Sequence, residues 1–178
     1  NSRNPSIRYI VSTDNYTGEF VFMKEIWLPS DIFKEFKTEV NFFKKFQHPN
    51  LIPMLNYFVQ EQYGYIVEPF AEGNDLHTLM CNLDWRLEEK YHKIISKTIL
   101  ELINMLQGEY YVFRDIKTEN IVFMVRNIEE LFQSDEIFAQ SIRLIDAGAA
   151  ENKFSGNCRF RGTYKPPEYE NVGYISYS

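Results

Sequence analysis

The segment Tyr111-Val-Phe-Arg-Asp-Ile-Lys-Thr-Glu-Asn-Ile-Val-Phe123 sets an acid, a base and an amide side chain between two short β-forming runs. Residues 110–112 and 121–125 are typical of strands, and the polar residues between them are typical of a loop. We expect this loop to bring Asp115, Lys117 and Asn120 to one point. Such a group suits phosphoryl transfer, because it can orient a hydroxyl, meet phosphate charge and ligate Mg²⁺. A charged surface hairpin is the alternative interpretation.

The composition indicates a folded chain, long enough for one compact unit or two small lobes. Its 178 residues are 16% aromatic, which excludes a disordered chain. The formal net charge of −6 argues against a nucleic-acid-binding surface, whereas a nucleotide site needs only a few local cations. Two cysteines, Cys81 and Cys158, form neither a disulfide framework nor a metal site. No apolar run is long enough to predict a membrane span.

The first part of the chain is predicted to be a sheet with one helix. Residues 8–13 and 19–26 are β-rich runs around a turn at 14–18, and residues 51–59 and 65–70 are expected to be further strands. A helix is predicted to begin near Pro29-Ser-Asp31, because an apolar stripe follows at helical spacing: Phe33, Phe36, Val40 and Phe43.

The second part is predicted to be mainly helical. A short helix runs through Met80, and residues 87–107 form the longest helical pattern, with Gly108 as its C-cap. Residues 126–141 are charged and partly helical, and they precede a strand at 142–145. We expect them to lie on the surface as a docking element or a long loop.

Arg114-Asp-Ile-Lys-Thr-Glu-Asn120 resembles the catalytic loop H-R-D-L-x-x-x-N of eukaryotic-type protein kinases, with Phe113 in place of the histidine. Other segments resemble kinase elements in the family's order: residues 17–24 the V-A-I-K strand, 68–76 the hinge, 146–148 D-F-G, and 162–168 G-T…A-P-E. The resemblance implies an α+β, bilobal protein-kinase-like fold. Its domains would be a sheet lobe at 1–68 and, at 69–178, the hinge with an incomplete, mainly helical large lobe.

The resemblance also implies roles for four polar residues of the second lobe. Asp115 would orient the acceptor hydroxyl, and Lys117 would stabilise the γ-phosphate of ATP. Asn120 and Asp146 would bind Mg²⁺. The interval from Asp115 to Asp146 is longer than in the family. Residues 126–141 lie within this interval and are interpreted as an insertion.

Nucleotide contacts are implied on the first lobe. Lys24 would hold the α/β-phosphates, and Glu39 would position Lys24, with Glu35 one turn earlier as the competing candidate.

The hinge resemblance implies backbone contacts to adenine along residues 68–76. Val67 and Phe70 are the expected contacts, although the alignment slips by one residue, so that Glu68 competes with Val67. Asp75 would hold the ribose hydroxyls or act as an ordinary helix N-cap.

Three departures from the family stand out. No glycine lies in residues 1–8, where G-x-G-x-x-G is expected, so that an upstream loop or the side chains of Ser2, Arg3, Ser6 and Arg8 would have to meet the phosphates. Phe113 stands where the family has a histidine, and Ala147 stands where it has the phenylalanine of D-F-G. These two positions pack together in the family, so the aromatic side chain has moved from one position to the other. The sequence stops soon after Glu168, which implies a fragment or a shortened kinase whose underside is covered by a partner or a missing segment.

The leading hypothesis is a Ser/Thr protein kinase that uses ATP and Mg²⁺ on a protein substrate, since Lys117 resembles the Ser/Thr class. The alternative is a pseudokinase that acts as a nucleotide-binding or scaffold module. A small-molecule kinase is disfavoured by Lys117. We further expect Arg114 to receive a phosphorylated residue such as Ser155, and Thr163 to be a structural partner of Asp115.

Overall fold

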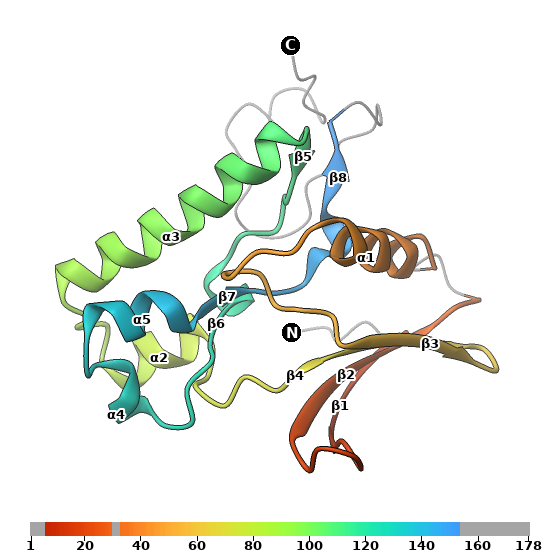
Figure 1. The fold of residues 1–178 in the computed structure, drawn as a ribbon, viewed down its shortest axis with the longest axis horizontal. Helices are drawn as coiled ribbons and strands as arrows, with labels where there is room; N and C mark the ends of the chain where they lie inside the picture. The colour runs from red at the N-terminus through yellow and green to blue at the C-terminus, as the bar shows by residue number, and fades with distance from the viewer. Residues whose placement is uncertain (1–5, 30–32, 154–178) are drawn as a thin grey trace. The chain divides into compact units, whose positions relative to one another are not determined.

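The computed structural model describes residues 6–29 and 33–153. The chain divides into two compact units (Figure 1). Unit 1 contains Asn1–Gln47 and Ile52–Phe70, and unit 2 contains His48–Leu51 and Ala71–Ser178. The predicted boundary at residues 68/69 lies close to the end of unit 1, but His48–Leu51, expected in the first lobe, belongs to unit 2.

Unit 1 is built on a four-stranded antiparallel sheet in the order β1-β2-β4-β3. The strands are β1 (Ile7–Thr13), β2 (Phe20–Trp27), β3 (Asn56–Gln60) and β4 (Tyr63–Pro69). The predicted strand at 51–59 is wrong in its first half, because β3 begins only at Asn56 and Pro53 has no N–H for a ladder. Leu51 instead bridges Leu144 within unit 2.

Helix α1 (Phe33–Lys45) packs on this sheet through part of the predicted apolar stripe, whereas Phe33, the first residue of that stripe, is exposed. Phe36 and Val40 form a core cluster with Ile26 of β2 and Ile66 of β4. A Cβ at Gly64 would lie 2.8 Å from the Phe36 ring, so glycine at this position lets the helix lie close to the strand. The sheet therefore has one face that α1 partly covers.

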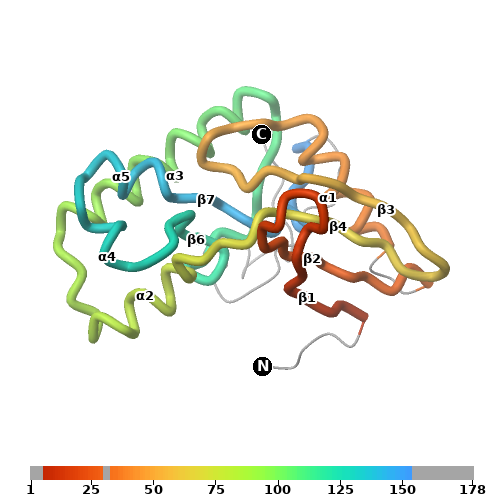
Figure 2. The backbone as a smooth tube through the Cα atoms, turned by 60° about the horizontal axis from the view of Figure 1, so that its bottom comes forward, coloured from red at the N-terminus to blue at the C-terminus, as the bar shows by residue number. Residues whose placement is uncertain are grey.

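Unit 2 combines helices with two short sheets. Figure 2 traces its backbone and shows β6 and β7 side by side. In one sheet β5 (Tyr111–Val112) pairs with β8 (Glu151–Asn152), and in the other β6 (Ile121–Phe123) pairs with β7 (Ile142–Leu144). The helical elements are α2 (Leu76–Asn82), α3 (Glu89–Gly108), α4 (Ile128–Leu131), α5 (Asp135–Ser141) and the short 3-10 turns η1 (Thr118–Asn120) and η2 (Ala147–Ala149). The α+β class predicted from the sequence is confirmed.

The predicted C-cap of the long helix is wrong. Gly108 is the last residue of α3, Glu109 is the C-cap with φ −94°, and the left-handed residue is Tyr110 at φ 61°. In the part of the chain that the structure describes, no helix is both long and apolar enough to cross a membrane.

The insertion at residues 126–141 is not a long loop, because it forms α4 and α5 and packs against α3. The Phe138 side chain is fully buried, and its ring centroid lies 4.5 Å from that of Tyr91 on α3 and 5.4 Å from that of Phe123 on β6. Phe132 adds an edge-on contact to Tyr91 at 5.1 Å. The insertion thus contributes to the core of unit 2.

Candidate functional site

The catalytic-loop segment connects two different sheets. β5 pairs with β8 and β6 pairs with β7, so the strands on either side of the loop do not pair with each other. The charged surface hairpin considered as an alternative is therefore wrong. Each end of the loop is held by a strand from later in the chain, which positions residues 113–120 from both sides.

Asp115, Lys117 and Asn120 come together at the end of this loop. The Lys117 Nζ lies 2.8 Å from Asp115 Oδ2. The Asn120 amide nitrogen donates to the Asp115 main-chain oxygen at 2.9 Å and to Oδ2 at 3.1 Å. These bonds hold the Asp115 carboxylate in one orientation.

The charge of Lys117 is stabilised by its surroundings. Partial burial disfavours the charged ammonium, but the hydrogen bond that Lys117 donates to Asp115 and the negative charges of Asp115, Asp146 and Glu119 outweigh it and raise the pKa of Lys117 above its ordinary value. Lys117 therefore stays a cation and can meet phosphate oxygens. Asp146 is thus one of the acids whose negative charge acts on Lys117.

Asp146 reaches the site through strand pairing. Ile121 of β6 lies opposite Leu144 of β7, and the Ile145 N–H donates to the Asn120 main-chain oxygen at 2.9 Å. Asp146, the next residue, has left-handed backbone angles (φ 61°, ψ 74°) and accepts from the Gly148 N–H at 3.4 Å.

Left-handed backbone also occurs at Arg114 (φ 68°), at the other side of the loop. For residues other than glycine such angles cost about 1–3 kcal/mol, and they concentrate where surrounding structure enforces a functional geometry.

Asn120 and Asp146 fit a magnesium site. Both Asn120 nitrogen bonds go to Asp115, and its amide oxygen makes no hydrogen bond to the described residues, so that oxygen remains as a ligand. Amide and carboxylate oxygens are the ligands Mg²⁺ prefers, usually completed by water and substrate phosphates. No cluster of three or more His, Cys, Asp or Glu side chains suited to a metal occurs among the described residues, so the two would supply part of a coordination shell.

Lys24 and Glu39 form a buried ion pair in unit 1. Lys24 Nζ lies 2.8 Å from Glu39 Oε2, and their side chains are 10% and 1% exposed. Lys24 comes from β2 and Glu39 from the face of α1 that packs on the sheet. Between the two candidates of the sequence analysis, the structure pairs Lys24 with Glu39, whereas Glu35 is half-buried one turn earlier.

Sheet register places the hinge candidates of unit 1. Glu68 lies opposite Phe22 and Val67 opposite Met23, so Glu68 shares a face with Lys24 and Val67 lies on the other face. Phe70 packs edge-on against Phe20 at 6.3 Å, and its N–H donates to the Phe20 oxygen at 3.3 Å.

Asp75 is an N-cap in unit 2. Its carboxylate accepts from the Thr78 N–H at 2.9 Å and from the Thr78 hydroxyl at 2.8 Å, which starts α2. The preceding Gly73 lies against β6, where a Cβ would come within 2.6 Å of the Phe123 oxygen. Asp75 itself bridges Val122, so α2 begins beside the strand that follows the catalytic loop.

Two further cations have acidic partners. The Arg114 guanidinium pairs with Glu151 of β8 at 2.5 Å and donates to the Ala149 oxygen at 2.7 Å. Arg8, considered as a phosphate-binding side chain, pairs instead with Glu25 at 2.8 Å. Because Arg8 lies opposite Glu25 and Tyr9 opposite Lys24, Arg8 is on the face of the sheet away from Lys24.

Ser155, Thr163 and Glu168 lie outside the described residues. Phe113 and Ala147 are both buried in unit 2, and their coupling stays a prediction. Sequence reasoning missed Glu151 as the partner of Arg114, because an acid after Ala149-Ala150 carries no local signal, and only the β5–β8 pairing brings the two together.

Comparison with known proteins agrees with this geometry. The sequence matches the protein kinase domain family over residues 10–174. It is 30% identical over 115 residues to calcium-dependent protein kinase 3 of Plasmodium yoelii yoelii, which covers 65% of this chain and 19% of that protein. It is 29% identical over 143 residues to the DNA damage response protein kinase DUN1 of Saccharomyces cerevisiae, covering 73% of this chain and 27% of that one.

A third relative is the probable serine/threonine-protein kinase fhkD of Dictyostelium discoideum, with 29% identity over 132 residues, covering 66% of this chain and 18% of that protein. The chain thus spans 18% to 27% of the length of these three relatives. The family match, by contrast, takes in most of this chain, including the catalytic loop, Lys24, Glu39 and Asp146. The α+β kinase fold expected from the motifs is confirmed, and the chain belongs to the protein kinase family.

Proposed function

We propose that this chain transfers the γ-phosphate of ATP to Ser or Thr hydroxyls of a protein substrate. The observation that carries the proposal is the group of Asp115, Lys117 and Asn120, with Asp146 held beside it by the bond from Ile145 to Asn120. Protein kinase domains generally use ATP and a divalent metal. The Ser/Thr preference rests on Lys117, which resembles the lysine of that class.

Each side chain has one task in this proposal. Asp115 accepts the hydroxyl proton as the oxygen attacks phosphorus, and Lys117 offsets the negative charge on the transferred group. In the other unit, Lys24 meets the α/β-phosphates, and Glu39 holds its ammonium in place.

Asn120 and Asp146 would hold Mg²⁺ through their amide and carboxylate oxygens. Bound Mg²⁺ supplies positive charge that neutralises the phosphates.

The test is Asp115→Asn in the natural full-length protein. The variant keeps the shape and removes the base, so phosphate transfer to Ser/Thr peptides should fall by about 10²–10⁴-fold with the fold retained. Asp135→Asn is the matched control, since Asp135 is an exposed acid that also pairs with a lysine, at 3.3 Å from Lys90. Equal transfer by wild type and Asp115→Asn contradicts the assignment.

Metal dependence gives a second test. Calorimetry with ATP should show tighter binding with Mg²⁺ than without it, and Asp146→Asn should remove the difference. Equal affinity in both conditions contradicts the role of Asn120 and Asp146.

A second candidate function is a nucleotide-binding or scaffold module without turnover. The observations that favour it are the glycine-free residues 1–8, Ala147 in place of the family's Phe, and the hinge backbone, where Pro69 has no N–H and the Phe70 N–H already donates to Phe20. Wild-type protein that binds ATP with Mg²⁺ but transfers no phosphate to any peptide would favour this candidate.

A further inference from the structure

Strand β3 forms one edge of the unit 1 sheet, next to β4. All of its residues are exposed, including Tyr57 at 40%, Phe58 at 39% and Val59 at 57%. The strand contains no charged residue and no proline, the residue types that commonly protect a sheet edge from pairing with another chain. Within residues 6–29 and 33–153, no strand pairs with the outer side of β3. This edge is therefore open to a further strand.

The backbone groups on the outer side of β3 belong to Tyr57 and Val59. In an antiparallel sheet a residue directs its N–H and its C=O to the same side, and that side alternates along the strand. The Tyr57 N–H donates to the side-chain oxygen of Asn56 at 2.8 Å, which identifies Tyr57 as a residue of the outer side. By the alternation, Val59 also directs its N–H and C=O outward. A further strand would bond these groups in place of the Asn56 side chain.

A second copy of β3 fits these groups in one register. In an antiparallel pair about a twofold axis at Phe58, Tyr57 of each copy lies opposite Val59 of the other, so the outward backbone groups meet. An aromatic side chain opposite a β-branched one is a favoured cross-strand pair. Asn56 then lies opposite Gln60, and no charge of the strand meets its own copy. The strand is thus complementary to itself.

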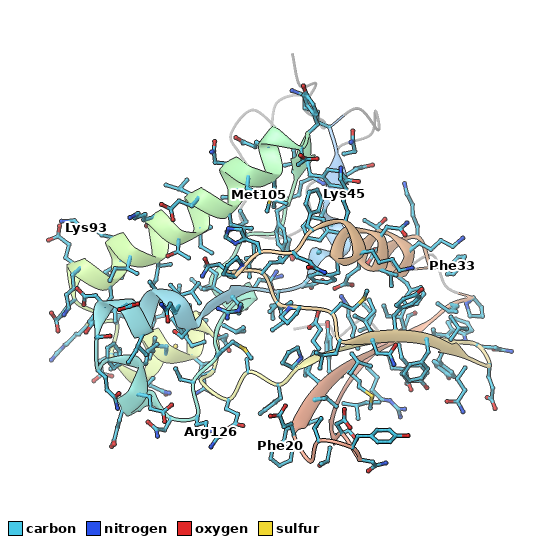
Figure 3. All side chains as sticks on the ribbon, viewed as in Figure 1. Phe20, Phe33, Lys45, Lys93, Met105 and Arg126 are labelled. Atoms are coloured by element: carbon cyan, nitrogen blue, oxygen red, sulfur yellow. The ribbon has the colours of Figure 1, made fainter. Side chains whose placement is uncertain are left out.

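Both faces of the strand carry contacts that this pairing would retain. On one face Phe58 stacks on Tyr65 of β4, with ring centroids 4.7 Å apart. The twofold axis would bring the two Phe58 rings together and extend this aromatic row into the second copy. On the other face Lys44, in the last turn of α1, donates to the Tyr57 hydroxyl at 2.7 Å. Figure 3 labels its neighbour Lys45 at this end of the helix.

We propose that β3 is a self-association edge, at which two copies of this chain join their unit 1 sheets into one continuous antiparallel sheet. The pairing covers the open edge and buries the exposed side chains of Tyr57, Phe58 and Val59. Because a strand of 5 residues buries less area than a standard protein–protein interface, the dimer is weak and its population depends on concentration. The inference goes beyond the proposed function and uses no residue assigned to ATP, metal or catalysis.

The experiment measures the mass of the natural full-length protein by sedimentation at increasing concentration. Wild type should pass from monomer to dimer over about 1–100 μM, as a weak interface does. Amide hydrogen exchange at Tyr57 and Val59 should slow as the dimer forms, because their N–H groups become bonded. A wild type that stays monomeric overturns the proposal, and so does a dimer in which these amides exchange as fast as in the monomer.

Val59→Lys is the disrupting variant, because a lysine on an edge strand opposes pairing. Val11→Lys is the matched control, since Val11 is 52% exposed on β1, the other edge strand of the same sheet. Val59→Lys should weaken dimerisation by about tenfold or more, whereas Val11→Lys should leave it unchanged. Equal effects of the two variants, or a loss in Val11→Lys alone, overturn the proposal. Thermal unfolding checks that each variant is folded.

A charge pair tests the register and separates pairing from misfolding. Tyr57→Glu alone should weaken the dimer as Val59→Lys does, and it replaces that variant if Val59→Lys does not fold. In the double variant, each new glutamate lies opposite the new lysine of the other copy, so dimerisation should recover. Damage to the fold would instead accumulate when the second substitution is added. A double variant that dimerises more weakly than either single variant overturns the proposal.

Discussion

Breaking the Lys24–Glu39 pair should destabilise unit 1 strongly. Both side chains are almost completely buried, at 10% and 1% exposure, and their charged atoms lie 2.8 Å apart. Glu39→Gln keeps the shape but removes the negative charge that lies 2.8 Å from the Lys24 ammonium. Loss of one partner of a buried ion pair costs about 3–5 kcal/mol. The free energy of unfolding should fall by that amount.

An exposed pair of the same length provides the control. Lys93 and Glu89 on α3 are 2.7 Å apart, but their side chains are 74% and 81% exposed. Water screens this pair, so Glu89→Gln should cost less than about 1 kcal/mol. Urea denaturation of the two variants separates the effect of burial from that of distance.

The double variant Lys24→Met with Glu39→Leu tests the cause. Replacing both charges by apolar groups removes the buried charge, so most of the lost stability should return, although ATP binding should not. The reasoning is refuted if Glu39→Gln costs no more than Glu89→Gln, or if the double variant is as unstable as the single one.

Three further predictions concern unit 2. Phe138→Ala should lower the free energy of unfolding by about 3–5 kcal/mol in chemical denaturation, because its fully buried ring fills the core beside α3; a loss below 1 kcal/mol would contradict that role. Glu151→Gln removes a charged partner of Arg114 and should lower the free energy of unfolding by about 1.5–3 kcal/mol. The same change at an exposed surface acid should have almost no effect. Burial lowers the pKa of His48 below its ordinary value, an effect that the charge of Arg143 increases and that of Glu101 opposes. The unfolded state therefore binds the proton more readily than the folded state, and stability should fall as pH drops below about 6.5. His48→Asn should flatten this part of the pH profile, which unfolding at several pH values measures.

Local spacing was sufficient to predict several features. The apolar stripe of α1 follows from its 3.6-residue period, so the helix and the burial of Phe36, Val40 and Phe43 could be predicted, although Phe33 is exposed. The offsets within residues 114–120 likewise predicted that Asp115, Lys117 and Asn120 would meet, since a short loop between strands leaves little freedom. The relative positions of side chains a few residues apart on one element are set mainly by the backbone geometry of that element.

Distant pairings required the tertiary structure. The Arg114–Glu151 and Tyr9–Phe22 contacts depend on which strands pair and in which register, and a shift of one residue would turn each side chain to the other face. The helical packing of the insertion was also missed, because the burial of Phe138 depends on Tyr91, far away in sequence. The sequence by itself thus determined the chemical groups and their local spacing. Strand pairing and core packing decided which groups from distant segments meet, because burial and hydrogen bonding between remote segments set those contacts.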